Sequence, residues 1–108
     1  MSEVGYFYVF IPMRYRGAVE DLDPEFWGLL DRLMEHDGRD QVRDTSASGC
    51  GRGATLEFYV QADSARDALA RVESHVSAAF DEGANIEHWV REAPRVIPED
   101  QMDQYYAS

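Results

Sequence analysis

The chain has 108 residues, the length of one domain, and 44% of them are hydrophobic, which is enough to build a core without disulfides or metal. Its 21 acidic residues against 10 basic ones give a formal net charge of −11. This excess of negative charge repels phosphate backbones and anionic lipid headgroups, so it argues against nucleic-acid and membrane-surface binding. It suits either simple solubility or docking onto a basic partner protein.

The cysteine content and the start of the chain bear on its compartment. The single cysteine, Cys50, excludes an intrachain disulfide and fits a reducing environment. No charged leader followed by an apolar run opens the chain, and the longest apolar run, residues 6–13, is far too short to cross a bilayer. All 10 basic residues are arginine, which indicates a GC-rich coding bias. We therefore predict a cytoplasmic bacterial protein.

The first half of the chain predicts a strand followed by a helix. Tyr6–Ile11 is aromatic and β-branched, as strands are, and Pro12 bounds it. Asp23–Glu25 is a helix start, because an N-cap acid precedes a proline at the first helical position and an acid in the first turn. Apolar residues at helical spacing follow, and Trp27 and Met34 widen this inward stripe. Gly38 is expected to end the helix.

The middle of the chain contains its best turn and strand signals. Residues 39–47 are polar and predict a weak edge strand, with coil as the alternative. Glycine at positions 49, 51 and 53 is expected to form a tight turn, since glycine favours neither helices nor strands. Residues 54–62 then alternate between apolar and polar side chains, which is the period of a half-buried strand.

A second helix and a last strand complete the expected fold. Ser64–Asp67 resembles a capping box with Asp in place of Glu, and apolar residues at helical spacing follow it up to Gly83. A last strand fits residues 84–91, with Val90 facing the helices and Trp89 facing away. The order β-α-β-β-α-β predicts an α+β, ferredoxin-like sandwich, an antiparallel sheet with two helices on one face. We expect one domain over residues 1–93 and an acidic, aromatic tail over residues 94–108.

The open face of the expected sheet is the first candidate binding surface. An uncovered aromatic patch usually marks an interface or a pocket. Two simpler explanations of this aromatic face are a sheet-to-sheet homodimer and a cover formed by Tyr105 and Tyr106 of the tail. RNA binding is disfavoured, because the charge is wrong and the RNP sequence pattern is absent. The side chains expected on this face are Tyr6, Tyr8, Phe10, Tyr59 and Trp89.

The expected topology also brings several arginines to one end of the sheet, near the glycine turn. Arg14, Arg16, Cys50 and Arg52 form a candidate site for a carboxylate or a phosphate. The glycines precede a strand rather than a helix, so neither the phosphate loop nor the dinucleotide fingerprint is matched. An ordinary hairpin explains the glycines equally well.

Signals for metal binding or catalysis are weak in this sequence. The acids from Glu20 to Glu25 lack calcium-loop spacing, and helix capping accounts for them. His36, His75 and His88 lack the spacing of a zinc helix, and Cys50 has no histidine beside it in sequence. We therefore predict no metal and no cofactor, and name no catalytic residue.

Three functional hypotheses follow from these observations. The first is a non-enzymatic protein–protein interaction module of the immunity-protein, inhibitor or regulator kind, which binds a basic protein partner or a second copy of itself. The second is a cofactor-free enzyme or small-molecule binder of the dimeric α+β barrel kind, with a pocket between two sheets. The third is an anion-sensing domain that uses the arginines near the glycine turn. Charge, aromatic content and the missing catalytic signature favour the first.

Overall fold

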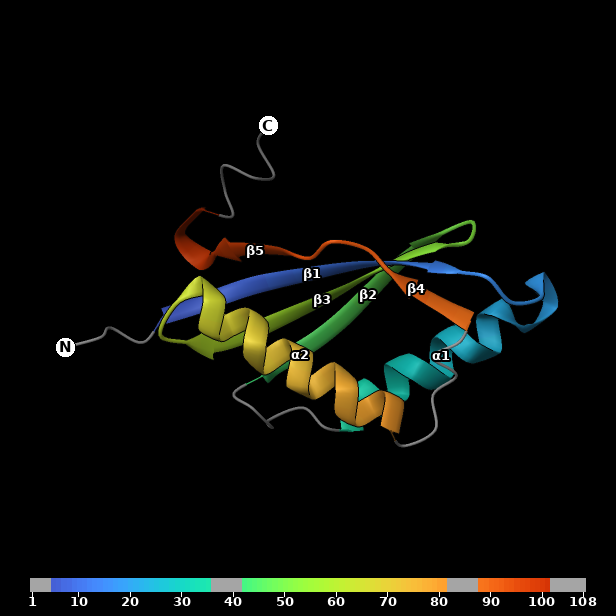
Figure 1. The fold of residues 1–108 in the computed structure, drawn as a ribbon, viewed down its shortest axis with the longest axis horizontal. Helices are drawn as coiled ribbons and strands as arrows, with labels where there is room; N and C mark the ends of the chain where they lie inside the picture. Colours follow the sequence, from blue (N-terminus) through green and yellow to red (C-terminus); the bar gives the residue numbers. More distant parts are fainter. Residues whose placement is uncertain (1–4, 36–41, 82–87, 102–108) are drawn as a thin grey trace.

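In the computed structural model, two helices pack on one face of a single antiparallel sheet (Figure 1). The structure describes residues 5–35, 42–81 and 88–101. The strand order β2-β3-β1-β4 and the helix layer confirm the α+β, ferredoxin-like prediction. The elements are β1 (Gly5–Tyr15), α1 (Val19–Glu35), β2 (Val42–Cys50), β3 (Gly53–Ala62), α2 (Ala65–Asp81), β4 (Trp89–Arg91), β5 (Arg95–Pro98) and the 3-10 helix η3 (Glu99–Gln101).

The glycine-rich segment forms a hairpin that is tighter than expected. β2 lies at the edge of the sheet, as predicted, but it continues through Gly49 to Cys50, where the glycines indicated only a turn. The loop between β2 and β3 is reduced to Gly51 and Arg52. Gly51 has a φ of 59°, a conformation that two-residue hairpin loops require and that residues with a Cβ rarely adopt.

The strand beside β1 on its other edge is broken into two pieces. β4 pairs with Met13–Tyr15, and β5 pairs with Phe7–Phe10, both antiparallel. Between the two pieces, residues 92–94 oppose only residues 11 and 12, so the strand contains a one-residue bulge. Pro12 lies at this bulge, where its carbonyl accepts a hydrogen bond of 2.8 Å from the Glu92 N–H. Residues 95–98 therefore belong to the sheet and not to a separate tail, which corrects the domain boundary expected at residue 94.

The predicted orientation of the last strand is wrong. Trp89 pairs with Tyr15, and both side chains face the helices. Trp89 is only 6% exposed, whereas Val90 is 38% exposed on the opposite face. Packing the large indole ring against Tyr15, with ring centroids 4.9 Å apart, buries more apolar surface than burying a valine would. Residues 84–87 of the predicted strand lie outside the described residues.

The hydrophobic core lies between the sheet and the helices. Alternate residues of β1 and β3 point into it, because successive side chains of a strand face opposite sides of the sheet. Leu33 of α1 and Val72 and Val76 of α2 close the core from the helix side and are fully buried. The strand residues with the lowest exposure in this core are Val9, Ile11, Val42, Leu56, Phe58 and Val60.

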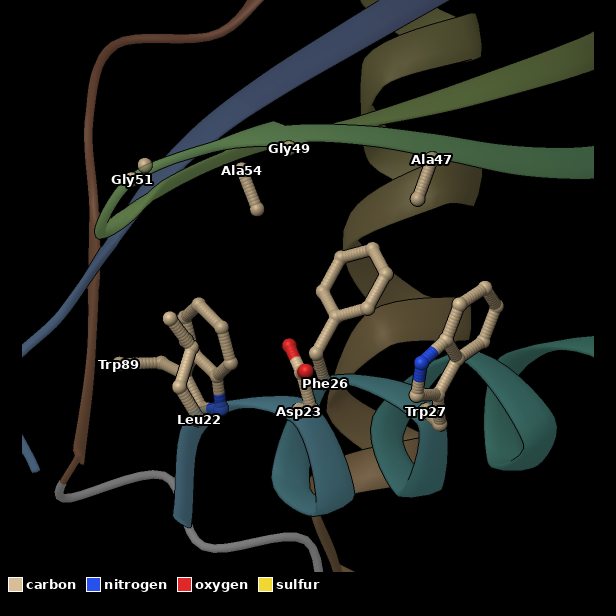
Figure 2. Close-up of a pocket in the computed structure, with 10 residues that line it drawn as sticks. Leu22, Asp23, Phe26, Trp27, Ala47, Gly49, Gly51, Ala54 and Trp89 are labelled. Atoms are coloured by element: carbon tan, nitrogen blue, oxygen red, sulfur yellow. The ribbon is translucent and has the colours of Figure 1, made fainter. Parts of the chain in front are cut away.

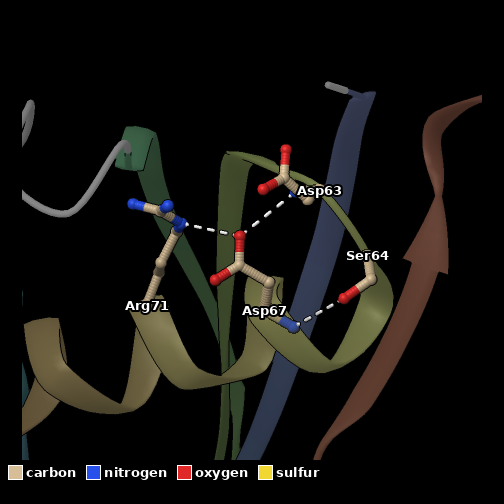
Figure 3. Close-up of polar contacts among 4 residues, drawn as sticks. All are labelled: Asp63, Ser64, Asp67 and Arg71. Atoms are coloured by element: carbon tan, nitrogen blue, oxygen red, sulfur yellow. Dashed lines mark hydrogen bonds and ion pairs between the residues drawn. The ribbon is translucent and has the colours of Figure 1, made fainter. Parts of the chain in front are cut away.

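The Ser64 side chain caps α2 as predicted, but the return bond of the capping box goes to the Asp63 N–H instead of the Ser64 N–H (Figure 3). The Asp67 N–H donates to Ser64 Oγ at 3.1 Å, and the Asp67 carboxylate accepts from the Asp63 N–H at 3.1 Å and from Arg71 Nε at 3.0 Å. The backbone hydrogen bond from Asp63, and then Arg71, hold the pKa of the Asp67 carboxyl below its usual value. The bond to Ser64 satisfies the Asp67 N–H, one of the backbone N–H groups that the first turn of a helix leaves without a partner.

We expect Ser64→Ala to lower the free energy of unfolding by about 1 kcal/mol, because it removes the acceptor for the Asp67 N–H. Urea denaturation monitored by circular dichroism measures the change. Ser77→Ala is the control, since Ser77 is an exposed residue inside α2 and alanine has the higher helix propensity. An equal loss in both variants would argue against the cap.

Candidate functional site

A pocket of about 370 Å³ opens between the first half of α1 and the β2–β3 hairpin (Figure 2). Side chains of α1 form one wall of the pocket, and the hairpin forms the opposite wall (Figure 2). We call this hollow the α1–hairpin pocket. Its lining residues are Leu22, Asp23, Phe26 and Trp27 of α1, Ala47, Gly49, Gly51, Gly53 and Ala54 of the hairpin, and Trp89 of β4.

The pocket exists because the hairpin carries almost no side-chain bulk. Along β2, the residues near the start are large enough to close the core, with Val42 fully buried and Thr45 4% exposed. Farther along, the strand offers only Ala47 and Gly49 to the pocket, and Ala54 of β3 is equally small. Side chains of this size leave the aromatic rings of α1 uncovered, so a hollow remains at this end of the helix–sheet interface.

The α1 side of the pocket is aromatic, and one carboxylate points into the pocket from it. The Phe26 ring meets Trp27 edge-on at 5.3 Å and Trp89 at 6.4 Å, measured between ring centroids. Figure 2 shows the Asp23 carboxylate directed toward the hairpin between these rings. Asp23 is the one ionisable residue in the lining. Both tryptophans of the chain belong to it, which makes their fluorescence a direct probe of this pocket.

Helix α1 differs from its prediction in ways that shape this site. It begins at Val19 rather than at Asp23, so Pro24 lies inside the helix and Asp23 lines the pocket instead of capping it. Trp27 and Met34 do not widen the buried stripe, because they are 58% and 50% exposed. The helix carries six acidic residues against one arginine, a net charge of −5.

The other flank of α1 is tied down by a polar cluster. Glu25 Oε1 lies 3.0 Å from His88 Nδ1, and the His88 ring meets the buried Tyr15 ring edge-on at 5.8 Å. Arg52 Nη1 donates to the Gly17 carbonyl at 2.9 Å, which joins the tip of the hairpin to the loop between β1 and α1. These contacts hold α1, β1 and the hairpin in place around the α1–hairpin pocket.

Burial, together with the nearby Glu25 carboxylate, raises the pKa of Tyr15 to about 12. An unfolded tyrosine ionises near pH 10, so above that value the unfolded chain loses a proton that the folded chain retains. We expect the free energy of unfolding to be unaffected by Tyr15 below pH 10 and to fall between pH 10 and 12. Guanidinium denaturation across this range measures the effect, and Tyr15→Phe should show a shallower fall than the natural chain.

The residues of the predicted anion site reach the same end of the sheet but do not form one site. Arg14 pairs with Gly53, and the Arg52 carbonyl accepts from the Tyr15 N–H at 2.8 Å. Arg14 and Arg16 line a shallow hollow that Arg52 does not reach, and Arg14 lies 3.6 Å from Glu92. Arg52 is directed to Gly17, and the side chain of Cys50 lies outside the described residues.

The predicted aromatic face is present in part. Tyr6 stacks on Tyr59 with centroids 5.0 Å apart, and Tyr8 lies 4.9 Å from Tyr59. Phe10 shares this face by its register but is only 8% exposed, and Trp89 lies on the opposite face. We call Tyr6, Tyr8 and Tyr59 the tyrosine face.

Segment η3 lies against the tyrosine face. Tyr59 Oη donates to Glu99 Oε1 at 2.8 Å. Burial has the larger effect on the pKa of Tyr59, and together with this carboxylate it raises that pKa to about 12. Tyr105 and Tyr106, the alternative cover for this face, lie outside the described residues.

The sheet itself is not acidic. The five strands carry four arginines against two acidic residues, so the negative charge of the chain lies elsewhere, above all on α1.

Comparisons with known proteins add support for the fold alone. No family model matches the chain, and no curated protein matches it. A solved structure titled "Structural Genomics, protein YJCS" superposes with a TM-score of 0.52 at 11% identity, covering 84% of this chain and 95% of that chain. An uncharacterized protein from Thermotoga maritima, TM1266, reaches a TM-score of 0.42 at 9% identity, covering 90% of this chain and 99% of that chain. Separately, the helices within residues 5–35, 42–81 and 88–101 lack the length and apolar character needed to span a bilayer.

Proposed function

We propose that this chain is a non-enzymatic interaction module that binds a basic partner protein through α1. One observation carries the proposal: the most acidic element is also the one that exposes apolar surface. Four large hydrophobic side chains of the described residues are exposed, and three of them, Val19, Trp27 and Met34, lie on α1. Single exposed apolar side chains are common on proteins, but their concentration on one charged element supports a docking site there.

The two properties of α1 would serve different steps of binding. A net charge of −5 attracts a basic protein over several ångströms and disfavours acidic competitors. Trp27 then supplies a large, rigid apolar contact beside the α1–hairpin pocket, and tryptophan is prominent among residues that dominate binding energy. This assignment moves the expected contact surface from the tyrosine face to the helix layer.

Site-specific photo-crosslinking tests this proposal. In this experiment a photoreactive phenylalanine analogue replaces Met34 of α1 in the cells that naturally produce the protein. After illumination, we expect it to form a covalent adduct with one basic protein. The same analogue at Ser74, an exposed position on α2, is the control and should form none. Raising the salt concentration or introducing Asp31→Lys should reduce the Met34 adduct, because both weaken the attraction. Equal adducts from both positions, or an adduct indifferent to salt and charge, would refute α1 as the docking surface.

Self-association through the sheet is a second candidate, favoured by the stacked rings of the tyrosine face. Neither α1 nor α2 covers this face, and tyrosine is common at interfaces. Sedimentation over a range of protein concentrations tests it. A dimer that Tyr8→Arg dissociates would support this candidate, and a monomer at all concentrations would exclude it.

A further inference from the structure

We infer that the partner presents an extended, arginine-containing segment that adds to the free edge of β2 and places the arginine side chain in the α1–hairpin pocket. The inference rests on the proposed function, because it specifies what the basic partner inserts. Two independent features of the structure support it: an open strand edge and a pocket of suitable chemistry directly beside that edge.

The first feature is the edge of β2. In the described part of the chain, β2 pairs with β3 alone, so its outer backbone N–H and C=O groups face away from the sheet. The irregularity between Val42 and Asp44 lies at the start of the strand, and the pairing from Thr45 to Cys50 is regular. Residues 46–49 are all serine, alanine or glycine, so this stretch carries none of the charged or proline residues that commonly protect an edge. Extended peptides commonly bind by adding to such an edge.

The second feature is the position of the pocket relative to this edge. Ala47 and Gly49 of β2 form one wall, and Asp23 and Trp27 of α1 stand opposite them (Figure 2). In a strand added beside β2, every second side chain would point to the helix layer. A side chain level with Ala47 or Gly49 would therefore enter the space between the hairpin and Trp27. Backbone pairing and side-chain insertion are thus compatible in one docking geometry.

The chemistry of the lining selects arginine. The aromatic rings of Phe26 and Trp27 suit both the apolar stem and the planar guanidinium, which stacks on aromatic faces. The Asp23 carboxylate can accept hydrogen bonds from a guanidinium in the two-pronged geometry that arginine favours. An acidic side chain would be repelled by Asp23 and by the net charge of α1.

Defined peptides test this inference with the full chain. The probe is the acetylated and amidated peptide Thr-Val-Thr-Arg-Thr-Val-Thr, in which arginine and both valines share one strand face. Its matched control carries citrulline, the neutral isostere, in place of arginine. Two further versions carry N-methyl groups at alternate residues, which remove the backbone N–H donors along one edge of the strand. The two versions differ in which edge is blocked. Tryptophan emission reports binding, because both tryptophans of the chain line the pocket.

We expect the arginine peptide to bind at least about tenfold more tightly than the citrulline peptide, and Asp23→Asn to reduce that preference. One N-methylated version should lose binding and the other should keep it, since only one edge of the added strand pairs with β2. Ala47→Leu should abolish binding by filling the pocket, with no loss of melting temperature. Ser48→Leu, the same side chain on the opposite face of β2, should leave binding intact.

Three results would overturn the inference: equal binding of the arginine and citrulline peptides, no effect of Ala47→Leu, or equal binding of both N-methylated versions. If these occur while the salt-sensitive Met34 adduct persists, the partner docks on α1 in another way and the proposed function stands. If the adduct is also missing, the proposed function fails together with the inference.

Discussion

Replacing Gly17 with alanine is expected to lower the free energy of unfolding by about 3 kcal/mol. A Cβ at this position would lie 2.5 Å from Cζ of Tyr15 and still closer to its hydroxyl, which real Cβ atoms do not tolerate. The Tyr15 ring cannot yield easily, because it is 1% exposed and packs between Trp89 and His88. Guanidinium denaturation of the natural chain and the variant measures the loss.

Gly28→Ala is the matched control for this experiment. Gly28 lies in α1, and a Cβ there would meet no atom within 4 Å. Alanine in a helix interior is favoured over glycine by up to about 1 kcal/mol, so this variant should be more stable than the natural chain. The same chemical change is therefore expected to have opposite signs at the two positions. Full stability of Gly17→Ala would contradict the close approach of Gly17 to Tyr15.

Phe58→Ala is expected to cost about 3–5 kcal/mol, a large part of the stability of a domain this size. Phe58 has no exposed surface and lies in β3 between Val9 of β1 and Thr45 of β2. Its ring also meets His75 of α2 edge-on at 5.7 Å. Truncation would leave a cavity beneath α2 that the surrounding sheet cannot close.

Trp27→Ala makes a comparable aromatic truncation at the surface of α1. Because Trp27 is 58% exposed, its loss should change the free energy of unfolding by less than about 1 kcal/mol. Thermal and chemical denaturation of the two variants provide the comparison. A large loss of stability in Trp27→Ala would mean that this ring supports the fold rather than a docking surface.

Much of the fold could be predicted from the sequence, because β1 and β3 have clear strand patterns and α2 has a strong start signal. The orientation of Trp89 could not, since a three-residue strand has no measurable period and its register with Tyr15 depends on distant pairing. The helix start at Val19 is hard to predict for a different reason. Asp23 and Pro24 resemble a cap and a first helical residue, yet both are accommodated inside α1.

The candidate site was less predictable than the fold, because it joins residues that are far apart in sequence. Ala47, Gly49 and Ala54 become informative only when they are placed opposite Phe26 and Trp27. One signal is present in the sequence: apart from Arg52, every residue over positions 46–54 is small, which is unusual in strands that must cover a helix. The glycines in this run also fit a simple turn, and that interpretation does not reveal that the small side chains leave the α1–hairpin pocket open.

The most direct test of α1 as a docking surface is amide hydrogen exchange of the full chain, measured with and without the basic partner that crosslinks to Met34. We expect slower exchange on binding within Val19–Glu35 and at the β2 edge, Thr45–Cys50, with little change in Arg95–Pro98 and η3. Protection confined to β5 and η3, which border the tyrosine face, with exchange of α1 unchanged, would contradict the account.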